Sequence, residues 1–169
     1  MNLYLLRHGL AVEPGSPGYA TDADRPLTAE GERKMERIAE AMKALELSFD
    51  LILSSPYLRA RQTAEIVAKT LKARKRLELA DVLTPAHGPE RVVAHLKSLA
   101  PTPQDALLVG HEPGLSELIS FLVGGGADLA ITMKKGGLCK LAAEPLTAGH
   151  CASLEWLLTP KQMLLMAES

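Results

Sequence analysis

Short apolar runs alternate with segments of helical periodicity over most of the chain, and this alternation limits the fold more than any other feature. Each run is followed by a segment in which apolar residues recur three or four positions apart. A βαβαβαβα order is typical of a mostly parallel sheet covered by helices on both faces. We therefore predict an α/β fold, a three-layer α/β/α sandwich. The four candidate strands are Leu3–Leu6, Leu51–Leu53, Leu77–Leu79 and Ala106–Val109.

Capping residues and glycines mark where the helices should begin and end. Thr28 can cap the first helix, and Ser55 with Pro56 can open the second. Gly88-Pro89 precedes the third, and Gly124–Gly126 should stop the fourth.

The remainder of the chain carries two further apolar runs, Leu138–Ala142 and Ala152–Leu158, before a short helix that should start at Thr159-Pro160. The two runs are close enough in sequence to pair, so we expect an antiparallel strand near the C-terminus.

Composition excludes several classes of function. The 169 residues fit one domain, 1–169, and the net charge of −1 gives no excess of cations for nucleic acid or an anionic membrane. Two cysteines cannot form a disulfide framework or a thiolate zinc site. No apolar run approaches the ~18 residues of a membrane span, and the N-terminus lacks a signal-peptide pattern. These features predict a cytoplasmic protein.

Residues able to bind phosphate follow three of the four predicted strands. Arg7 and His8 follow the first, Arg59 lies just after the second, and His111 follows the fourth. Because the carboxyl ends of parallel strands meet at one edge of the sheet, these side chains should converge there. Arginine forks match phosphate oxygens, and helix N-termini add N–H donors. The pattern predicts a phosphate pocket.

Other sites and cofactors are not indicated. No His, Asp or Glu cluster has the spacing of metal ligands, and the triple glycine lacks the Lys-Ser/Thr of a phosphate-binding loop. We predict no metal and no cofactor. We interpret Arg25 and Arg61 as surface charges, and three further histidines as structural or solvated: His87, His95 and His150.

The sequence resembles the histidine phosphatase (phosphoglycerate mutase-like) superfamily, and within it the small SixA-type phosphohistidine phosphatases. Leu6–Gly9 looks like the RHG motif of that family, and 54–64, SSPYLRARQTA, looks like its second signature. Gly110–Pro113 is similar to the segment that carries the second pocket histidine. Further stretches that resemble the SixA-type group are Arg25–Thr28, Leu83–Pro85 and Trp156–Pro160.

The resemblance implies a covalent mechanism. His8 would attack phosphorus to give a phosphohistidine intermediate that water hydrolyses. Arg7, Arg59 and His111 would bind the phosphoryl oxygens and stabilise the transition state. Because the two arginines disfavour a further positive charge, they should keep His8 neutral.

The substrate is predicted from what the sequence lacks. Many members of the superfamily use an acidic residue after the third strand to protonate the leaving oxygen. The candidates here are Asp81 and Glu90, but neither falls in a clear family pattern. An alkoxide leaves poorly without such an acid, whereas an imidazole is far less basic. The core pattern also occupies the whole length, which leaves no insertion to enclose a small metabolite.

We therefore expect a phosphohistidine on a partner signalling protein as substrate. Two alternatives stay open. One is a phosphatase or mutase for small esters such as sugar phosphates, and the other is a phosphoryl carrier or phosphate-binding module that does not turn over.

Overall fold

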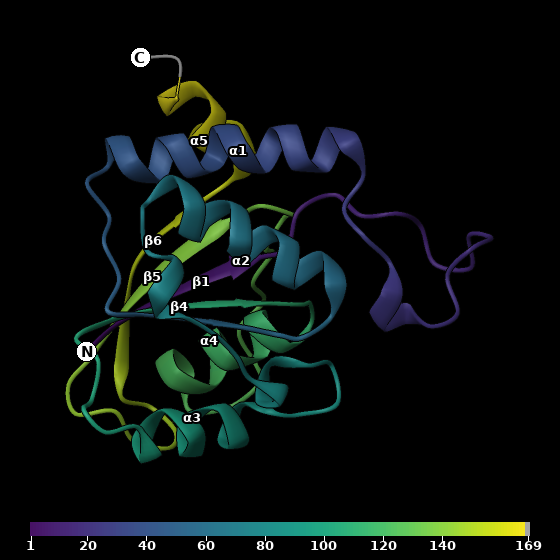
Figure 1. Ribbon diagram of the computed structural model, residues 1–169. Coiled ribbons are helices and arrows are strands. Elements are labelled where there is room, and N and C mark those ends of the chain that lie inside the picture. The colour runs from purple at the N-terminus through teal and green to yellow at the C-terminus, as the bar shows by residue number, and fades with distance from the viewer. Residues whose placement is uncertain (168–169) are drawn as a thin grey trace.

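A six-stranded sheet lies between two layers of helices in the computed structural model, which describes residues 1–167 (Figure 1). The strand order is β3-β2-β4-β1-β5-β6. The α/β/α sandwich expected from the sequence is confirmed. The strands are β1 (Asn2–Arg7), β2 (Leu51–Ser54), β3 (Leu77–Leu79), β4 (Asp105–Gly110), β5 (Leu138–Ala143) and β6 (Ala152–Leu158).

Strand direction decides which loops meet at the same edge of the sheet. β3, β2, β4 and β1 are mutually parallel, and β5 pairs antiparallel with both β1 and β6. The predicted antiparallel strand near the C-terminus is therefore β5. Since β6 runs in the direction of β1, the segments that follow β1, β2, β4 and β6 emerge at one edge, together with the turn before β5.

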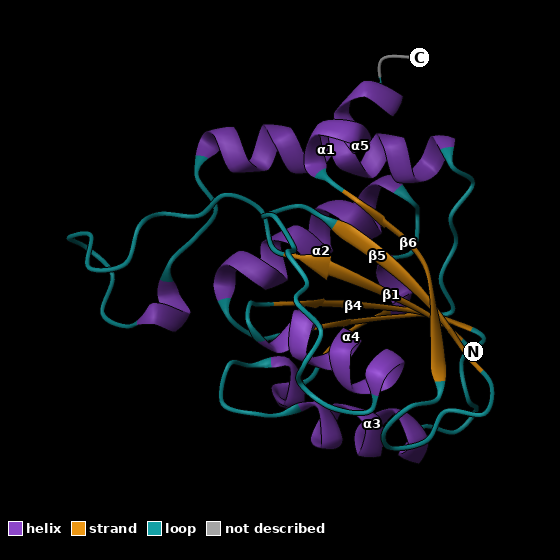
Figure 2. Ribbon diagram, turned by 180° about the vertical axis from the view of Figure 1, so that it is seen from behind, coloured by secondary structure: helices purple, strands orange, loops and turns teal. Residues whose placement is uncertain are grey.

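The helices divide between the two faces of the sheet (Figures 1 and 2). On β1, Leu3 and Leu5 pack against one helical layer, while Tyr4 and Leu6 pack against the other, as alternation along a strand requires. One layer holds α1 (Ala29–Ala44), α2 (Leu58–Thr70) and α5 (Pro160–Met166), and the other holds α3 (Pro89–Ser98) and α4 (Gly114–Gly124). Three short 3₁₀ helices are η1 (Asp22–Asp24), η2 (Arg74–Arg76) and η3 (Asp81–Leu83).

The predicted helix ends are confirmed at α1, α3, α4 and α5 and differ at α2: Gly88 precedes α3, and Thr159 caps α5. The Thr28 side chain accepts a hydrogen bond from the Gly31 N–H and so caps α1. Gly125, with φ of 82°, ends α4 in the left-handed conformation that glycine adopts without strain.

The prediction that Ser55 and Pro56 open α2 is wrong, because α2 begins at Leu58. The Ser55 hydroxyl contacts His111 instead of the first turn of a helix, and it accepts a hydrogen bond from the Tyr57 N–H.

The segment between β1 and α1 is the longest connection on the site edge, and residues 9–28 project beyond the body of the molecule there (Figure 1). At its start, this segment packs closely against α1: a Cβ at Gly31 of the helix would lie only 2.0 Å from the Leu10 carbonyl oxygen. Glycine at this position lets α1 and the segment approach closely. Within residues 1–167, no helix is both long and apolar enough to cross a membrane.

Candidate active site

His8 and His111 lie side by side because their strands are neighbours. Arg7 is in register with Gly110, and the His8 N–H donates to the Gly110 carbonyl at 3.1 Å. The next residue on each strand end is therefore a histidine, and the two ring centroids are 5.1 Å apart. The structure thus brings together two of the side chains that the sequence assigns to one pocket.

The hydrogen bonds of the His8 ring leave one nitrogen ready to react. Its Nδ1 is 2.8 Å from the Gly9 carbonyl oxygen, which can only accept, so Nδ1 carries the proton. Nε2 then keeps its lone pair, and the Arg59 Nε–H donates to it at 3.3 Å. A neutral imidazole whose Nε2 is unprotonated is the form that a nucleophile requires, and the Arg59 hydrogen bond must yield when Nε2 attacks.

Burial keeps both histidines neutral. Burial lowers the pKa of His8 to about 3, and the charges of His111, Arg59 and Arg7 add to that effect. Burial likewise lowers the pKa of His111 to about 4, with help from the Arg59 charge. The sequence reasoning gave the arginines as the cause, whereas the structure gives desolvation as the larger one.

His111 is held from two sides. Its Nε2 lies 2.8 Å from the Ser55 hydroxyl, and the Tyr57 ring meets it edge-on at 5.2 Å between centroids. Its Nδ1 is buried and has no hydrogen-bond partner among the described residues. A buried polar atom without a partner is costly, and a bound ligand oxygen would satisfy it.

Arg59 reaches the pocket from the first turn of α2, as expected, and only 4% of its surface is exposed. Thr63, one turn further along, bonds both the Arg59 carbonyl and the Gly9 N–H, so it fixes α2 against the end of β1. Each of the three guanidinium nitrogens makes one hydrogen bond: besides His8, the group donates to the Asp22 carbonyl at 2.7 Å and to the Asp22 carboxylate at 2.9 Å. A phosphoryl group must compete with Asp22 for these N–H groups.

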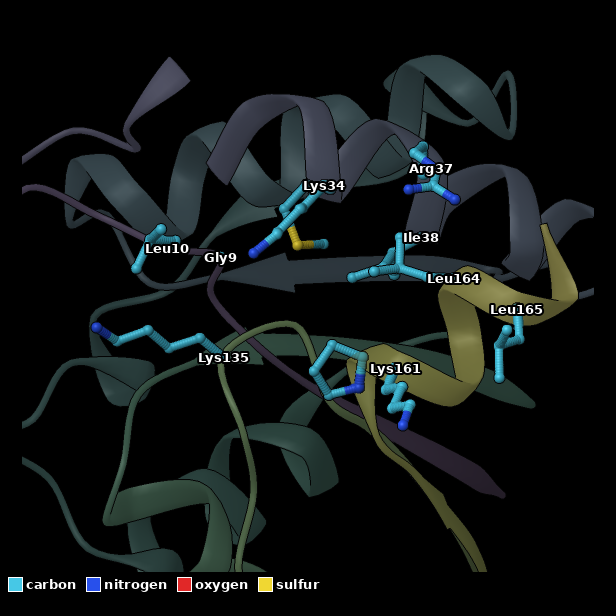
Figure 3. Close-up of a pocket in the computed structure, with 11 residues that line it drawn as sticks. Gly9, Leu10, Lys34, Arg37, Ile38, Lys135, Lys161, Leu164 and Leu165 are labelled. Atoms are coloured by element: carbon cyan, nitrogen blue, oxygen red, sulfur yellow. The ribbon is translucent and has the colours of Figure 1, made fainter. Parts of the chain in front are cut away.

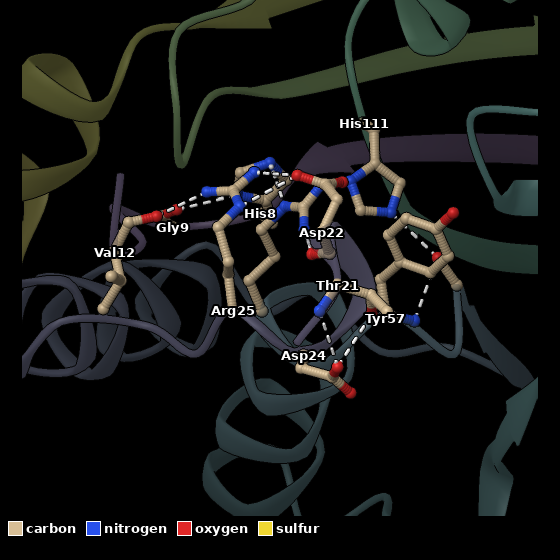
Figure 4. Close-up of polar contacts among 11 residues, drawn as sticks. His8, Gly9, Val12, Thr21, Asp22, Asp24, Arg25, Tyr57 and His111 are labelled. Carbon is tan, nitrogen blue, oxygen red and sulfur yellow. Dashed lines mark hydrogen bonds and ion pairs between the residues drawn. The ribbon is translucent and has the colours of Figure 1, made fainter. Parts of the chain in front are cut away.

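Asp22 stands over the pocket between two arginines (Figure 4). One carboxylate oxygen accepts from Arg59, and the other accepts from Arg25 at 2.6 Å. Partial burial acts to raise the pKa of Asp22, but the hydrogen bonds and charges of Arg25 and Arg59 outweigh it and hold the pKa below its usual value. Asp22 is therefore a carboxylate at neutral pH.

The prediction that Arg25 is a surface charge is wrong. Its side chain is 12% exposed, and besides Asp22 it bonds the Val12 carbonyl within the same projecting segment. The segment thus brings a third arginine to the pocket. Arg61, in contrast, is 51% exposed and pairs with Glu65 on the surface of α2, as predicted.

Arg7 lies on the side of the pocket away from α2. One terminal nitrogen donates to the Met133 carbonyl at 2.7 Å, while its Nε is buried without a partner among the described residues. The turn before β5 supports it: Gly136, at φ of 82°, donates its N–H to the carbonyls of Arg7 and His8. Arg7 Nε and His111 Nδ1 are two buried polar atoms without partners among the described residues, and the charges of both residues act on His8, which fits a pocket built for an anion.

The two candidate acids do not join this group. Asp81 lies in η3 and Glu90 in the first turn of α3, and both are exposed. The loop between them does reach His111, but the residues that line the small cavity there are uncharged or imidazole side chains, not these carboxylates. They include Leu83, Thr84, Pro85 and His87.

Three groups at the pocket are not assigned to it by the sequence. Asp22 lies in a polar loop with no strand or helix periodicity, Ser55 is predicted as a helix cap, and Arg25 as a surface charge. The resemblance of Arg25–Thr28 to the SixA-type group was the one signal that pointed to the projecting segment. No set of three or more His, Cys, Asp or Glu side chains that could hold a metal ion is present among the described residues.

Comparisons with known proteins identify the family and the fold. The model of the histidine phosphatase superfamily, branch 1, matches residues 3–84, which include Arg7, His8 and Arg59. An uncharacterized protein of Picosynechococcus sp. PCC 7002 is 36% identical over 97% of this chain and 99% of its own length. The phosphohistidine phosphatase SixA of Escherichia coli K12 is 27% identical over 95% of this chain and 94% of its own.

A solved structure extends the likeness to three dimensions. The protein histidine phosphatase SixA complexed with tungstate superposes with a TM-score of 0.80 at 26% identity, over 95% of this chain and 98% of that one. The fold, the ordered motifs and the arrangement of His8, Arg59 and His111 place this chain in the histidine phosphatase superfamily, as an enzyme of the phosphatase class.

Proposed function

We propose that this protein removes phosphate from a phosphorylated histidine on a partner protein, through a phospho-His8 intermediate. One observation carries the choice of substrate. The carboxylate that contacts the pocket, Asp22, is held ionised by Arg25 and Arg59, while Asp81 and Glu90 are exposed and do not line the wall beside His111. None of the three is set to protonate an alkoxide.

A phosphorylated imidazole makes a smaller demand on the enzyme. Its second ring nitrogen titrates near neutral pH, so water can protonate it, and the ring then leaves as neutral imidazole. A sugar alkoxide has no such route, and a positioned acid is worth ~10²–10⁴ in the rate of its departure. The pocket is therefore suited to a nitrogen leaving group.

The reaction divides into two displacements. In the first, the His8 Nε2 lone pair forms a bond to phosphorus as the bond from phosphorus to the substrate nitrogen breaks. In the second, water attacks phosphorus, the bond to Nε2 breaks, and inorganic phosphate leaves as the proton of the water passes to solvent. The Gly9 carbonyl holds the Nδ1 proton of His8 throughout.

The arginines and His111 supply the charge stabilisation. One guanidinium at ~4 Å contributes on the order of 4 kcal/mol of gross attraction to a phosphoryl oxygen, before desolvation. When Asp22 yields Arg59 and Arg25, two such groups turn to the phosphoryl oxygens. The SixA structure with bound tungstate supports this view, since tungstate is also a tetrahedral oxyanion.

The test compares substrates under one set of conditions. Phosphate release is measured from a histidine-phosphorylated protein, from free phosphohistidine and from a panel of sugar phosphates. We expect kcat/KM to be at least ~10²-fold higher for the phosphohistidines. Efficient hydrolysis of one sugar phosphate would favour the small-ester phosphatase, and release that stops at one equivalent per enzyme would favour the phosphoryl carrier.

A further inference from the structure

A second cavity opens between α1 and α5, next to the candidate active site. Its volume is about 470 Å³, and Gly9, the residue after the nucleophile, forms part of its wall. The floor is apolar: Met35 and Ile38 of α1 are almost fully buried, and Leu164 of α5 lies against them (Figure 3). A concave apolar floor of this size can hold one or two large side chains.

The rim of this cavity is basic. Of the eleven described residues that line it, four are cations and none is an acid: Lys34, Arg37, Lys135 and Lys161. Lys34 forms an exposed pair with Glu30, which lies outside the cavity, and such pairs are weak. Lys135 and Lys161 have no carboxylate within ion-pair distance among residues 1–167. In a chain of net charge −1, Lys135 and Lys161 thus give this rim two positive charges that no carboxylate among the described residues neutralises.

The cavity and His8 share one edge of the sheet. Lys135 lies in the turn whose Gly136 N–H binds the carbonyls of Arg7 and His8. Lys161 follows β6, which runs in the direction of β1, so α5 begins at the edge where β1 ends. A protein that presents a phosphohistidine to His8 therefore brings its neighbouring surface against this rim.

We propose that the cavity docks an acidic segment of the phosphohistidine-bearing protein, with an apolar side chain on Leu164 and carboxylates at Lys135 and Lys161. The proposal rests on the proposed function and names the chemistry of the partner. A protein segment fits better than a membrane, because the apolar surface is recessed between two helices, where a side chain can enter but a flat lipid surface cannot reach. Rim charges of this kind steer association and select partners.

Two synthetic peptides test the proposal, each phosphorylated on a single histidine. One carries glutamates and a leucine beside that histidine, and the other carries lysines and the same leucine. Free phosphohistidine is the third substrate. We expect the wild type to hydrolyse the acidic peptide with about tenfold higher kcat/KM than the basic one, mostly through KM. The preference should shrink at ~1 M salt, where the screening length is about 3 Å.

The variant Lys135→Glu/Lys161→Glu should abolish or reverse this preference and leave turnover of free phosphohistidine within about twofold. The matched control, Lys75→Glu/Lys97→Glu, changes the net charge equally at exposed positions outside the cavity and should keep the preference. Leu164→Ala should lower kcat/KM for both peptides and leave kcat/KM for free phosphohistidine unchanged. Retained turnover of free phosphohistidine shows that each variant is folded.

Three outcomes would overturn the docking proposal. The wild type could hydrolyse both peptides equally, or the control could lose the preference as fully as the cavity variant. Vesicles of phosphatidylglycerol could also bind the wild type through Lys135 and Lys161 while the peptides show no preference, which would assign the cavity to lipid. Failure to hydrolyse free phosphohistidine would instead contradict the proposed function itself.

Discussion

The pocket is built from two regions that are held in different ways. His8, Arg59 and His111 stand at strand ends and in the first turn of a helix, and each is at most 6% exposed. Asp22 and Arg25 belong to the projecting segment 9–28, and the Asp22 side chain is 51% exposed. Packing and backbone register fix the first region, whereas ion pairs hold the second against it.

This contrast suggests a division of labour. A nucleophile and its charge partners need fixed geometry, which strands and helices provide better than loops. A group that must leave when substrate arrives is better placed on an exposed loop, where its contacts are weaker. We therefore expect changes in the strand-end region to affect the rate strongly, and changes in the projecting segment to affect affinity modestly.

The largest effect should come from His8→Ala. Without the Nε2 lone pair no phosphoenzyme can form, so turnover should be abolished, and the acid-labile, alkali-stable phosphoryl label trapped on the wild type should disappear. His150→Ala, in an exposed loop, is the matched control. A chelator should leave wild-type activity unchanged. Full activity of His8→Ala, or a strict need for Mg²⁺, would contradict the mechanism.

Arg59→Ala and Arg7→Ala should each lower kcat/KM by roughly 10²–10³, the scale on which loss of one transition-state donor acts. Arg61→Ala provides the comparison, since that residue lies on the same helix as Arg59 but pairs with Glu65 at the surface. Steady-state kinetics with phosphohistidine should show almost no change for Arg61→Ala. Equal losses of kcat/KM in Arg59→Ala and Arg61→Ala would contradict a specific role of Arg59 in the transition state.

Acid should destabilise the protein through its two neutral histidines. Their folded-state pKa values of about 3 and about 4 lie below the ordinary 6.5, so unfolding takes up protons once the pH falls below 6.5. The stabilisation is complete above pH 6.5 and is lost as the pH drops toward about 4 for His111 and toward about 3 for His8. Between pH 6.5 and about pH 5 this should cost on the order of 1–2 kcal/mol per histidine.

Denaturant titrations at several pH values measure how the free energy of unfolding changes with pH. The His8→Asn variant should take up about one proton fewer on unfolding at acidic pH than the wild type does. An unchanged slope in this variant would show that His8 is not buried in its neutral form.

Asp22→Asn tests the projecting segment. Removing the charge that occupies Arg59 and Arg25 should tighten inhibition by inorganic phosphate about fivefold, the equivalent of ~1 kcal/mol for an ion pair whose carboxylate is half exposed. Inhibition constants measured against phosphohistidine hydrolysis give the comparison with wild type. Weaker inhibition in Asp22→Asn would mean that Asp22 orders the arginines for phosphate instead of competing with it.

The smallest effects should come from Asp81→Asn and Glu90→Gln. Since both side chains are exposed and do not line the wall beside His111, each change should alter phosphohistidine turnover by less than about tenfold. A large loss of turnover in either variant, together with efficient hydrolysis of a small phosphate ester, would identify that carboxylate as a general acid and favour the ester phosphatase.

Local patterns in the sequence determined most of the fold. Strand and helix periodicities act over a few residues, so the positions of all six strands could be predicted closely. Even β3, whose three residues give the weakest signal, lies at the predicted Leu77–Leu79. His8, His111 and Arg59 could be assigned to one pocket because they follow strands whose carboxyl ends meet at one edge.

Tertiary structure decided the contacts that no local pattern encodes. Asp22 lies 37 residues from Arg59, and Ser55 lies 56 residues from His111. Whether a serine caps a helix or holds a histidine depends on which partner the fold brings within reach. In the same way, Arg25 became a pocket residue only when its segment folded back over the strand ends. The sequence therefore determined the nucleophile and its scaffold. Long-range packing decided which groups surround them, including the carboxylate that competes with phosphate for the arginines, because those contacts join segments that are distant in the chain.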